Sequence, residues 1–412
     1  MHILDSEEYI SEKLNIRPVS KTRLTELRPY KYRPKTKDEL IAAIKEHIDS
    51  SNYDLNDIDV SKITDMNALF WGMDIENIDI SKWNVFNVTD MGWLFYNTKF
   101  NGDISNWNVS NVTNMQYIFD SSKFNGNISE WDVSNVTNFN RAFADSIFNG
   151  DISNWNVSSA VDMSAMFCEC EFDGDISKWN VSNVEDMSFM FAFTKFHGDI
   201  SKWNVGKVKS MTSMFCCENG NSKSGYFNGD ISKWNVGNVE NMTSMFHNNL
   251  DFNQNLTAWN VSKVKYMMYM FSRTTFNGDI SKWNVSRVEN MEQMFNLSRF
   301  NNDISKWDVG NVEKMTKMFY GSSFNGDISN WNVGNVKDMN AMFAYSDFNG
   351  DISLWDVSSV ETIEDMFYGC SQFDCDLSGW DISPICNISN AFSRTPIARK
   401  KSKQPKKIQT TI

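Results

Sequence analysis

The stretch that decides the fold runs from Phe100 to Phe119 and reads FNGDISNWNVSNVTNMQYIF. Twenty-four residues later the chain reads FNGNISEWDVSNVTNFNRAF, and related stretches precede and follow these two. A fixed period of roughly 20–50 residues predicts an array of stacked units, because one unit of this size cannot bury its apolar face alone. With Phe100 counted as position 1, the pattern fits about fourteen 24-residue units.

Two aromatic columns mark every unit. Position 8 is tryptophan in thirteen units and Ile58 in the first, and position 20 is phenylalanine in all fourteen. Apolar residues at positions 13, 16, 19 and 20 have the spacing of one helix face, which predicts a short helix. Trp and Val at positions 8 and 10 alternate with a polar residue, which predicts a very short strand. The predicted core includes Trp107, Trp131, Trp155, Phe119, Phe143 and Phe167.

The repeat resembles that of the BspA-type leucine-rich-repeat surface proteins, in its Trp/Met-rich variant. The matching motifs are WNVSNVTNM (107–115) and FNRAFADS (139–146), and the resemblance extends over about residues 54–393. It implies an α/β repeat solenoid, leucine-rich-repeat-like, in which each unit contributes a short parallel strand and a short helix. It also implies a surface or secreted protein that binds host or matrix proteins.

Three regions are expected along the chain. Residues 1–52 form an N-terminal segment whose helix, over 36–50, starts at a capping box of Thr36 and Glu39 and covers the first unit. Residues 53–393 form the solenoid. Residues 394–412 form a basic tail that we expect to be disordered.

Charge and hydropathy exclude two classes of partner. Residues 53–393 carry 43 acidic and 22 basic side chains, a net charge of −21, which disfavours nucleic-acid binding by the repeats. No apolar run of about 18 residues exists, so no membrane insertion is expected.

The start, MHILDSEEYISEKLN, lacks the basic patch and apolar run of a signal peptide, and no lipobox or anchor is visible. From the residues we therefore expect a cytoplasmic or non-classically exported protein, whereas the resemblance implies the cell surface.

No motif or residue cluster predicts catalysis, a cofactor or a metal site. The four histidines are scattered, and no P-loop, GxSxG or HExxH motif is present. The seven cysteines form no CxxC pair, which is typical of packing thiols. Two polar columns leave alternatives open. The aspartates at position 4 either cap turns or bind Ca²⁺ as a ladder, and the Asn/Asp column at position 9 is either structural or a binding ladder.

Aromatic residues at positions 18, 21 and 22 are the best candidates for binding. They lie opposite the apolar face of the expected helix, where core packing does not account for them, and exposed aromatic side chains suit protein or glycan contact. The alternative is that their rings cover neighbouring units and add stability. The inserted segment 216–226 is a second candidate. The aromatic candidates are Trp93, Tyr96, Tyr117, Phe189, Phe193, Tyr269, Tyr320, Tyr345 and Tyr368.

Three functions follow from these features. The first is a non-enzymatic repeat protein that presents an elongated surface for protein binding or adhesion. The second is a rod or spacer whose termini attach to other components. The third, a β-helix enzyme acting on glycans, is disfavoured by the helical spacing and by the lack of a local acid cluster.

Overall fold

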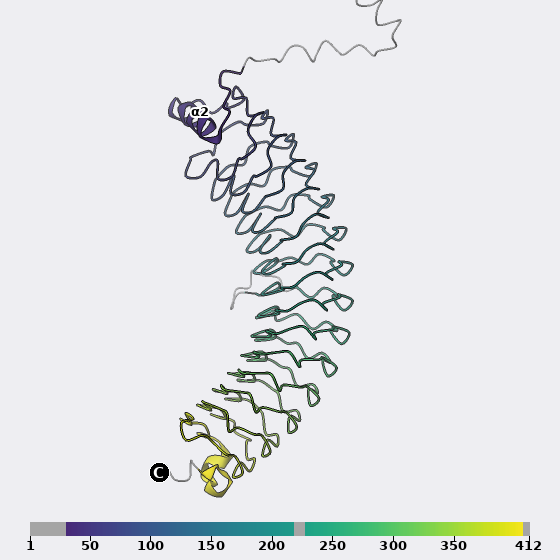
Figure 1. Ribbon diagram of the computed structural model, residues 1–412, viewed down its shortest axis with the longest axis vertical. Helices are drawn as coiled ribbons and strands as arrows, with labels where there is room; N and C mark the ends of the chain where they lie inside the picture. Colours follow the sequence, from purple (N-terminus) through teal and green to yellow (C-terminus); the bar gives the residue numbers. More distant parts are fainter. Residues whose placement is uncertain (1–29, 218–226, 407–412) are drawn as a thin grey trace, which may run out of the picture.

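The computed structural model describes residues 30–217 and 227–406 of the 412-residue chain. In these ranges the repeats lie one on top of another in a long, curved stack (Figure 1). Helix α2 (Lys37–Asp49) covers one end, and two 3₁₀ helices, η2 (Pro396–Arg399) and η3 (Lys401–Lys403), lie at the other. No helix in this part of the chain is long and apolar enough to span a bilayer.

The expected α/β solenoid of leucine-rich-repeat type is wrong. Within the described residues α2 is the one α-helix, and neither the strand expected at positions 8–10 nor the helix expected at positions 13–20 is present. Turns joined by irregular segments make up each unit instead. Position 15 of each unit forms a single-residue parallel bridge with position 15 of the next, as between Asn114 and Asn138.

Hydrogen bonds between units explain why no helix forms. In the unit that starts at Phe100, the N–H of Met115 donates to the carbonyl of Asn138 at 2.9 Å, and that of Tyr117 donates to the carbonyl of Asn140 at 2.8 Å. Positions 20 and 22 continue this pattern. An α-helix would direct the same N–H groups to carbonyls four residues earlier in its own segment. Because each of these N–H groups donates to the next unit, the segment does not form the hydrogen bonds of a helix.

Two β-turns in succession replace the expected helix. In the first, spanning positions 16–19, the N–H of Ile118 donates to the carbonyl of Met115 at 3.2 Å, and the third residue, Tyr117, has a φ of 55°. In the second, spanning positions 20–23, Ser121 has a φ of 58°. A positive φ at the third residue is typical of a type II turn. The paired turns direct positions 16, 19 and 20 inward, with the same spacing as a helix face.

The apolar columns form one continuous core along the stack. Rings at position 20 of successive units stack with centroids 5.5–6.0 Å apart. Each of the core residues expected from the sequence is at most 4% exposed: Trp107, Trp131, Trp155, Phe119, Phe143 and Phe167.

The tryptophan column joins the units through hydrogen bonds as well as through packing. In all thirteen units with tryptophan at position 8, the indole N–H donates to the carbonyl at position 5 of the preceding unit, at 2.9–3.2 Å. The first unit has Ile58 in this column. No earlier unit supplies a carbonyl there, so a buried indole N–H would lack this partner.

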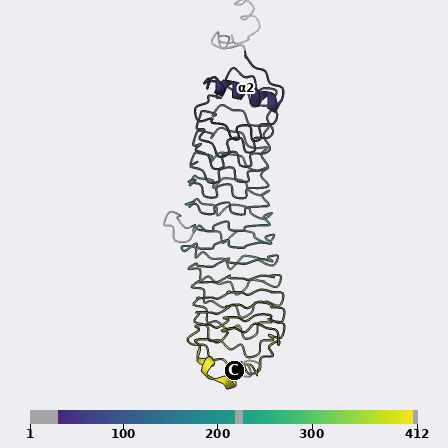
Figure 2. The same cartoon turned by 90° about the vertical axis from the view of Figure 1, so that its left-hand side faces the viewer.

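The stack bends because its two sides have different spacing. Stacked tryptophan rings at position 8 lie 6.3–6.5 Å apart, farther than the rings at position 20. Positions 14–22 carry the backbone hydrogen bonds between units, which hold neighbouring chains at about 4.8 Å. The hydrogen-bonded side therefore lies on the inside of the bend, the side that Figure 2 presents to the viewer.

Both ends of the stack are covered. Helix α2 begins after Thr36, whose hydroxyl accepts the N–H of Glu39, and it buries Leu40 and Ile44 against the first unit. At the other end, the expectation of a disordered tail from residue 394 fails for the described residues up to 406. Ile397 is fully buried there, because η2 and η3 fold over the last unit. Residues 407–412 of the expected tail and residues 1–29 of the N-terminal segment lie outside the described residues.

The backbone at position 18 gives a direct test of the paired turns. Position 18 has a positive φ in all fourteen units and is never glycine. A side chain in this left-handed region costs about 1 kcal/mol relative to glycine. We expect Lys317→Gly, at a φ of 52°, to raise the thermal unfolding midpoint above that of Lys317→Ala. The alanine variant is the control because it removes the same long side chain and keeps the strained Cβ. An equal or higher midpoint for alanine would contradict the turn assignment.

Candidate binding surface

The paired turns place positions 18, 21 and 22 on the hydrogen-bonded side, where the aromatic residues among them are half-buried or exposed. The nine aromatic candidates from the sequence all occupy these positions, and the structure divides them into separate groups. Trp93, Tyr96 and Tyr117 lie together near the α2 end, and Tyr320, Tyr345 and Tyr368 lie together near the other end. Within the described residues, no ring contact joins Phe189, Phe193 or Tyr269 to either group, so the nine do not form one patch.

The group near α2 joins four rings, of which Trp71 is exposed and the other three are half-buried. We call it the aromatic cluster: Trp71, Trp93, Tyr96 and Tyr117. The rings of Trp93 and Tyr117 stack with centroids 3.9 Å apart and planes 8° apart. Trp71 stacks on Trp93 at 5.9 Å, and Tyr96 meets the edge of Trp93 at 4.8 Å. The backbone hydrogen bonds between units determine the spacing of the units that carry these rings.

Trp71 was missed in the sequence analysis, although it is the most exposed member of the aromatic cluster, with 63% of its surface accessible. It lies at position 21 of the first unit, directly after Phe70. A signal was available, since Trp71 and Trp93 are the two of fifteen tryptophans that fall outside the position-8 column.

An arginine extends the aromatic cluster by one unit. The guanidinium of Arg141, at position 18, lies 5.4 Å from the ring centroid of Tyr117, within cation–π distance. Its Nε donates to Oδ2 of Asp120 at 2.5 Å, and Asp120 is only 1% exposed. A buried carboxylate held by one arginine fixes the guanidinium in place. Tryptophan, tyrosine and arginine are therefore presented side by side in fixed positions.

A row of polar side chains borders the aromatic cluster at positions 15 and 17. The carboxylate of Asp90 accepts the N–H of Gly92 at 2.8 Å and the amide of Asn114 at 3.0 Å. Asn67 donates to the same oxygen at 3.3 Å. The surface thus has an apolar centre with a hydrogen-bonding border, which is the usual layout of a protein interface.

The second aromatic group has a different arrangement. Tyr345, 52% exposed, meets Tyr320 and Tyr368 edge to face at 5.6 and 5.3 Å. Arg394 lies over the ring of Tyr368 at 5.1 Å. These rings cover neighbouring units without parallel stacking between them.

The remaining aromatic candidates belong to neither aromatic group. Phe193 packs on a small apolar group that includes Cys168 and Cys216, and Tyr269 accepts a hydrogen bond from Gln293 at 2.6 Å. Of the inserted segment expected at 216–226, Cys216 and Cys217 are buried, and residues 218–226 lie outside the described residues. Burial raises the pKa of both thiols to about 12, which keeps them protonated and unreactive.

The position-4 aspartates cap turns. Oδ1 of Asp103 accepts both the side-chain hydroxyl and the backbone N–H of Ser105, at 2.7 and 3.0 Å. These two hydrogen bonds lower the pKa of Asp103. Position 9 follows the same rule, since Asn108 accepts the N–H of Ser110 at 3.1 Å. Hydrogen bonds from the serine two residues later likewise lower the pKa of nine further aspartates: Asp151, Asp175, Asp199, Asp230, Asp279, Asp303, Asp327, Asp351 and Asp376.

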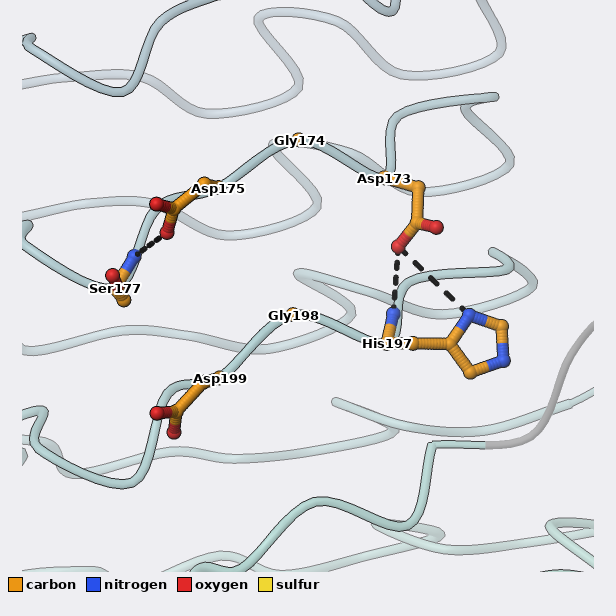
Figure 3. A pocket seen from close by; sticks show the side chains of 7 residues that line it. All are labelled: Asp173, Gly174, Asp175, Ser177, His197, Gly198 and Asp199. Carbon is orange, nitrogen blue, oxygen red and sulfur yellow. Dashed lines mark hydrogen bonds and ion pairs between the residues drawn. The ribbon is translucent and has the colours of Figure 1, made fainter.

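A shallow hollow between two of these turns brings a histidine close to acidic residues (Figure 3). The backbone N–H of His197 donates to Oδ1 of Asp173 at 2.9 Å, and its ring Nδ1 lies 3.8 Å from the same oxygen. Asp175 and Asp199 lie beyond the two glycines, each capping its own turn. Among the described residues, no three His, Cys, Asp or Glu side chains are arranged to hold a metal ion.

The capping aspartates make the fold sensitive to acid. Their folded-state pKa values lie below the ordinary value of 3.8, so they stabilise the folded state above that pH and lose this contribution as the pH falls through their lowered values. We expect a thermal unfolding midpoint that is nearly flat from pH 7 to about 5 and falls steeply below about pH 4. Replacing Asp103, Asp175 and Asp327 by Asn should reduce this fall, because Asn127 and Asn255 already cap the same turn in other units. Unchanged acid sensitivity in the triple variant would contradict this assignment.

Comparison with known proteins corrects the resemblance to BspA-type leucine-rich repeats. No such family model matches, and no curated protein matches the chain. One family model matches four times in tandem, over residues 39–147, 121–224, 217–299 and 296–404, and so spans almost the whole stack. The chain therefore belongs to the family described as Mycoplasma protein of unknown function, DUF285.

Proposed function

We propose that this chain is a non-enzymatic binding protein that recognises another protein through the aromatic cluster. The observation that carries the proposal is Trp71, a tryptophan left 63% exposed at the edge of a stacked array. A monomeric protein gains nothing in solubility from such a side chain, and exposed apolar patches of this kind mark interaction sites.

The composition of the surface supports protein recognition. Tryptophan, tyrosine and arginine dominate the energetic centres of protein interfaces. Here Trp71, Trp93, Tyr117 and Arg141 follow one another from unit to unit at ring distances of 5.9, 3.9 and 5.4 Å. The polar row around Asp90 supplies hydrogen-bonding groups at the border.

Rigidity supports the same proposal. The turns that carry Trp93 and Tyr117 are hydrogen-bonded to the units on both sides, so these two rings lose little conformational freedom on binding. A surface fixed in its binding conformation avoids part of the entropic cost of association. Adhesion, in which the partner belongs to another surface, is one form that such binding can take.

A rod or spacer is the second candidate. It is favoured by the even spacing of the buried columns and by the covers at both ends, since a rigid stack with closed ends can hold other components at a fixed distance. In that case the exposed rings only cover neighbouring units, and attachment depends on the termini.

The aromatic cluster can be tested by substitution. We expect the triple variant Trp71→Ser, Trp93→Ser and Tyr117→Ser to weaken binding to a purified partner by about 100-fold or more, because each residue of a binding hot spot contributes about 2 kcal/mol or more. The partner is first captured from the native source with the full chain and then purified, and affinity is measured by calorimetry.

The matched control substitutes the second aromatic group: Tyr320→Ser, Tyr345→Ser and Tyr368→Ser. It removes one exposed and two half-buried tyrosine rings, at positions 21 and 22, and should change affinity less than about threefold. Equal affinity for the wild-type chain and the cluster variant would overturn the proposal. Loss of binding upon removal of residues 1–29 alone would favour the rod, and capture of a glycan in place of a protein would contradict the partner class.

A further inference from the structure

The end of the stack opposite α2 is basic, whereas the body is acidic. Residues 394–406 contain six lysines and arginines and no acid. They are held on the last unit by buried side chains, Ile397 and Gln404, and by the N–H of Leu377, which donates to the carbonyl of Lys403 at 2.8 Å. These positive charges therefore occupy fixed places at one end of a body with a net charge of −21.

Most of these charges are not neutralised by the protein. Asp374 forms ion pairs with Lys400 and Lys403, and the hydrogen bond from Lys400 lowers the pKa of this carboxyl. Within the described residues, no carboxylate lies within ion-pair distance of Arg394 or Arg399. Since one acid is shared by two lysines, the end keeps a local excess of positive charge.

The unpaired arginines border a hollow of about 720 Å³ between the last unit and η2. Arg394, Arg399 and Lys400 line it, together with Ser371 and Thr395. Arg394 is held in place by its contact with the ring of Tyr368 at 5.1 Å. This volume lies in the range of small-molecule sites, which is about 300–1,000 Å³.

We propose that this hollow binds a phosphate group. Two guanidinium groups and an ammonium group offer more N–H donors than one carboxylate can accept, and a phosphate can accept hydrogen bonds on three or more oxygens. Arginine also matches phosphate with two parallel hydrogen bonds. The acidic body repels anions from its sides, which leaves this end as the place where a negatively charged ligand can approach.

This site is separate from the aromatic cluster. The two lie at opposite ends of the stack, so the chain can hold a phosphate-bearing ligand at one end and contact a protein partner near the other. The inference does not depend on the function proposed for the aromatic cluster.

The test uses the full chain with two probes. Binding of inorganic phosphate is measured by calorimetry. Binding to vesicles of phosphatidylglycerol and phosphatidylcholine is measured by co-sedimentation and compared with binding to vesicles of phosphatidylcholine alone. The variant is Arg394→Gln with Arg399→Gln. The control is Lys282→Gln with Lys306→Gln, which removes the same charge from exposed places on the body. Thermal unfolding of both variants shows whether the last unit stays folded.

We expect the arginine variant to lose at least about tenfold in affinity for the probe that binds, because hydrogen bonds to a charged group are among the strongest. The control should change affinity less than about twofold. Binding to inorganic phosphate identifies a free phosphate ligand as the source, whereas binding only to the anionic vesicles identifies a lipid headgroup.

Two outcomes would overturn the proposal: binding to neither probe, or equal loss of affinity in both variants.

Discussion

The stack depends on N–H groups that donate from one unit to the next. At positions 16, 18, 20 and 22 the backbone uses its donors between repeats, and this choice excludes the helix that the apolar spacing favours. The same hydrogen bonding requires a positive φ at position 18. The chain must turn twice within eight residues to bring alternate N–H groups to one side, and a type II turn has a positive φ at its third residue. The left-handed residues, the bend of the stack and the fixed spacing of the surface rings all follow from it.

The tryptophan column shows how a core position can also define an end. A buried indole N–H needs an acceptor, and position 5 of the preceding unit supplies it thirteen times. In the first unit, where that acceptor does not exist, the column has Ile58. Helix α2 then covers the apolar end that remains.

The sequence alone was sufficient to predict the period and the number of units, and its apolar columns are the ones that lie inside. It was insufficient for the local backbone. Apolar residues at 16, 19 and 20 are common to a helix face and to paired turns, and the usual marker of a positive φ is absent, since no unit has glycine at position 18. The expected strand at positions 8–10 was wrong for a related reason, because alternation over three residues also arises between two turns. The surface columns could be named, but the gathering of Trp93 with Tyr117 and Trp71 depends on the stacking distance between units.

The contacts of each unit with its neighbours also determine how the chain responds to force. A unit is held by one row of backbone hydrogen bonds, one indole bond and two faces of stacked rings, all of them to the units directly before and after it. Tension applied between the two ends loads these interfaces in series, and the weakest one opens first. Each unit that detaches exchanges a few ångströms of folded length for 24 residues of extended chain, roughly 80 Å. The stack is therefore stiff under small loads and extensible under large ones, with the end covers as the first parts at risk.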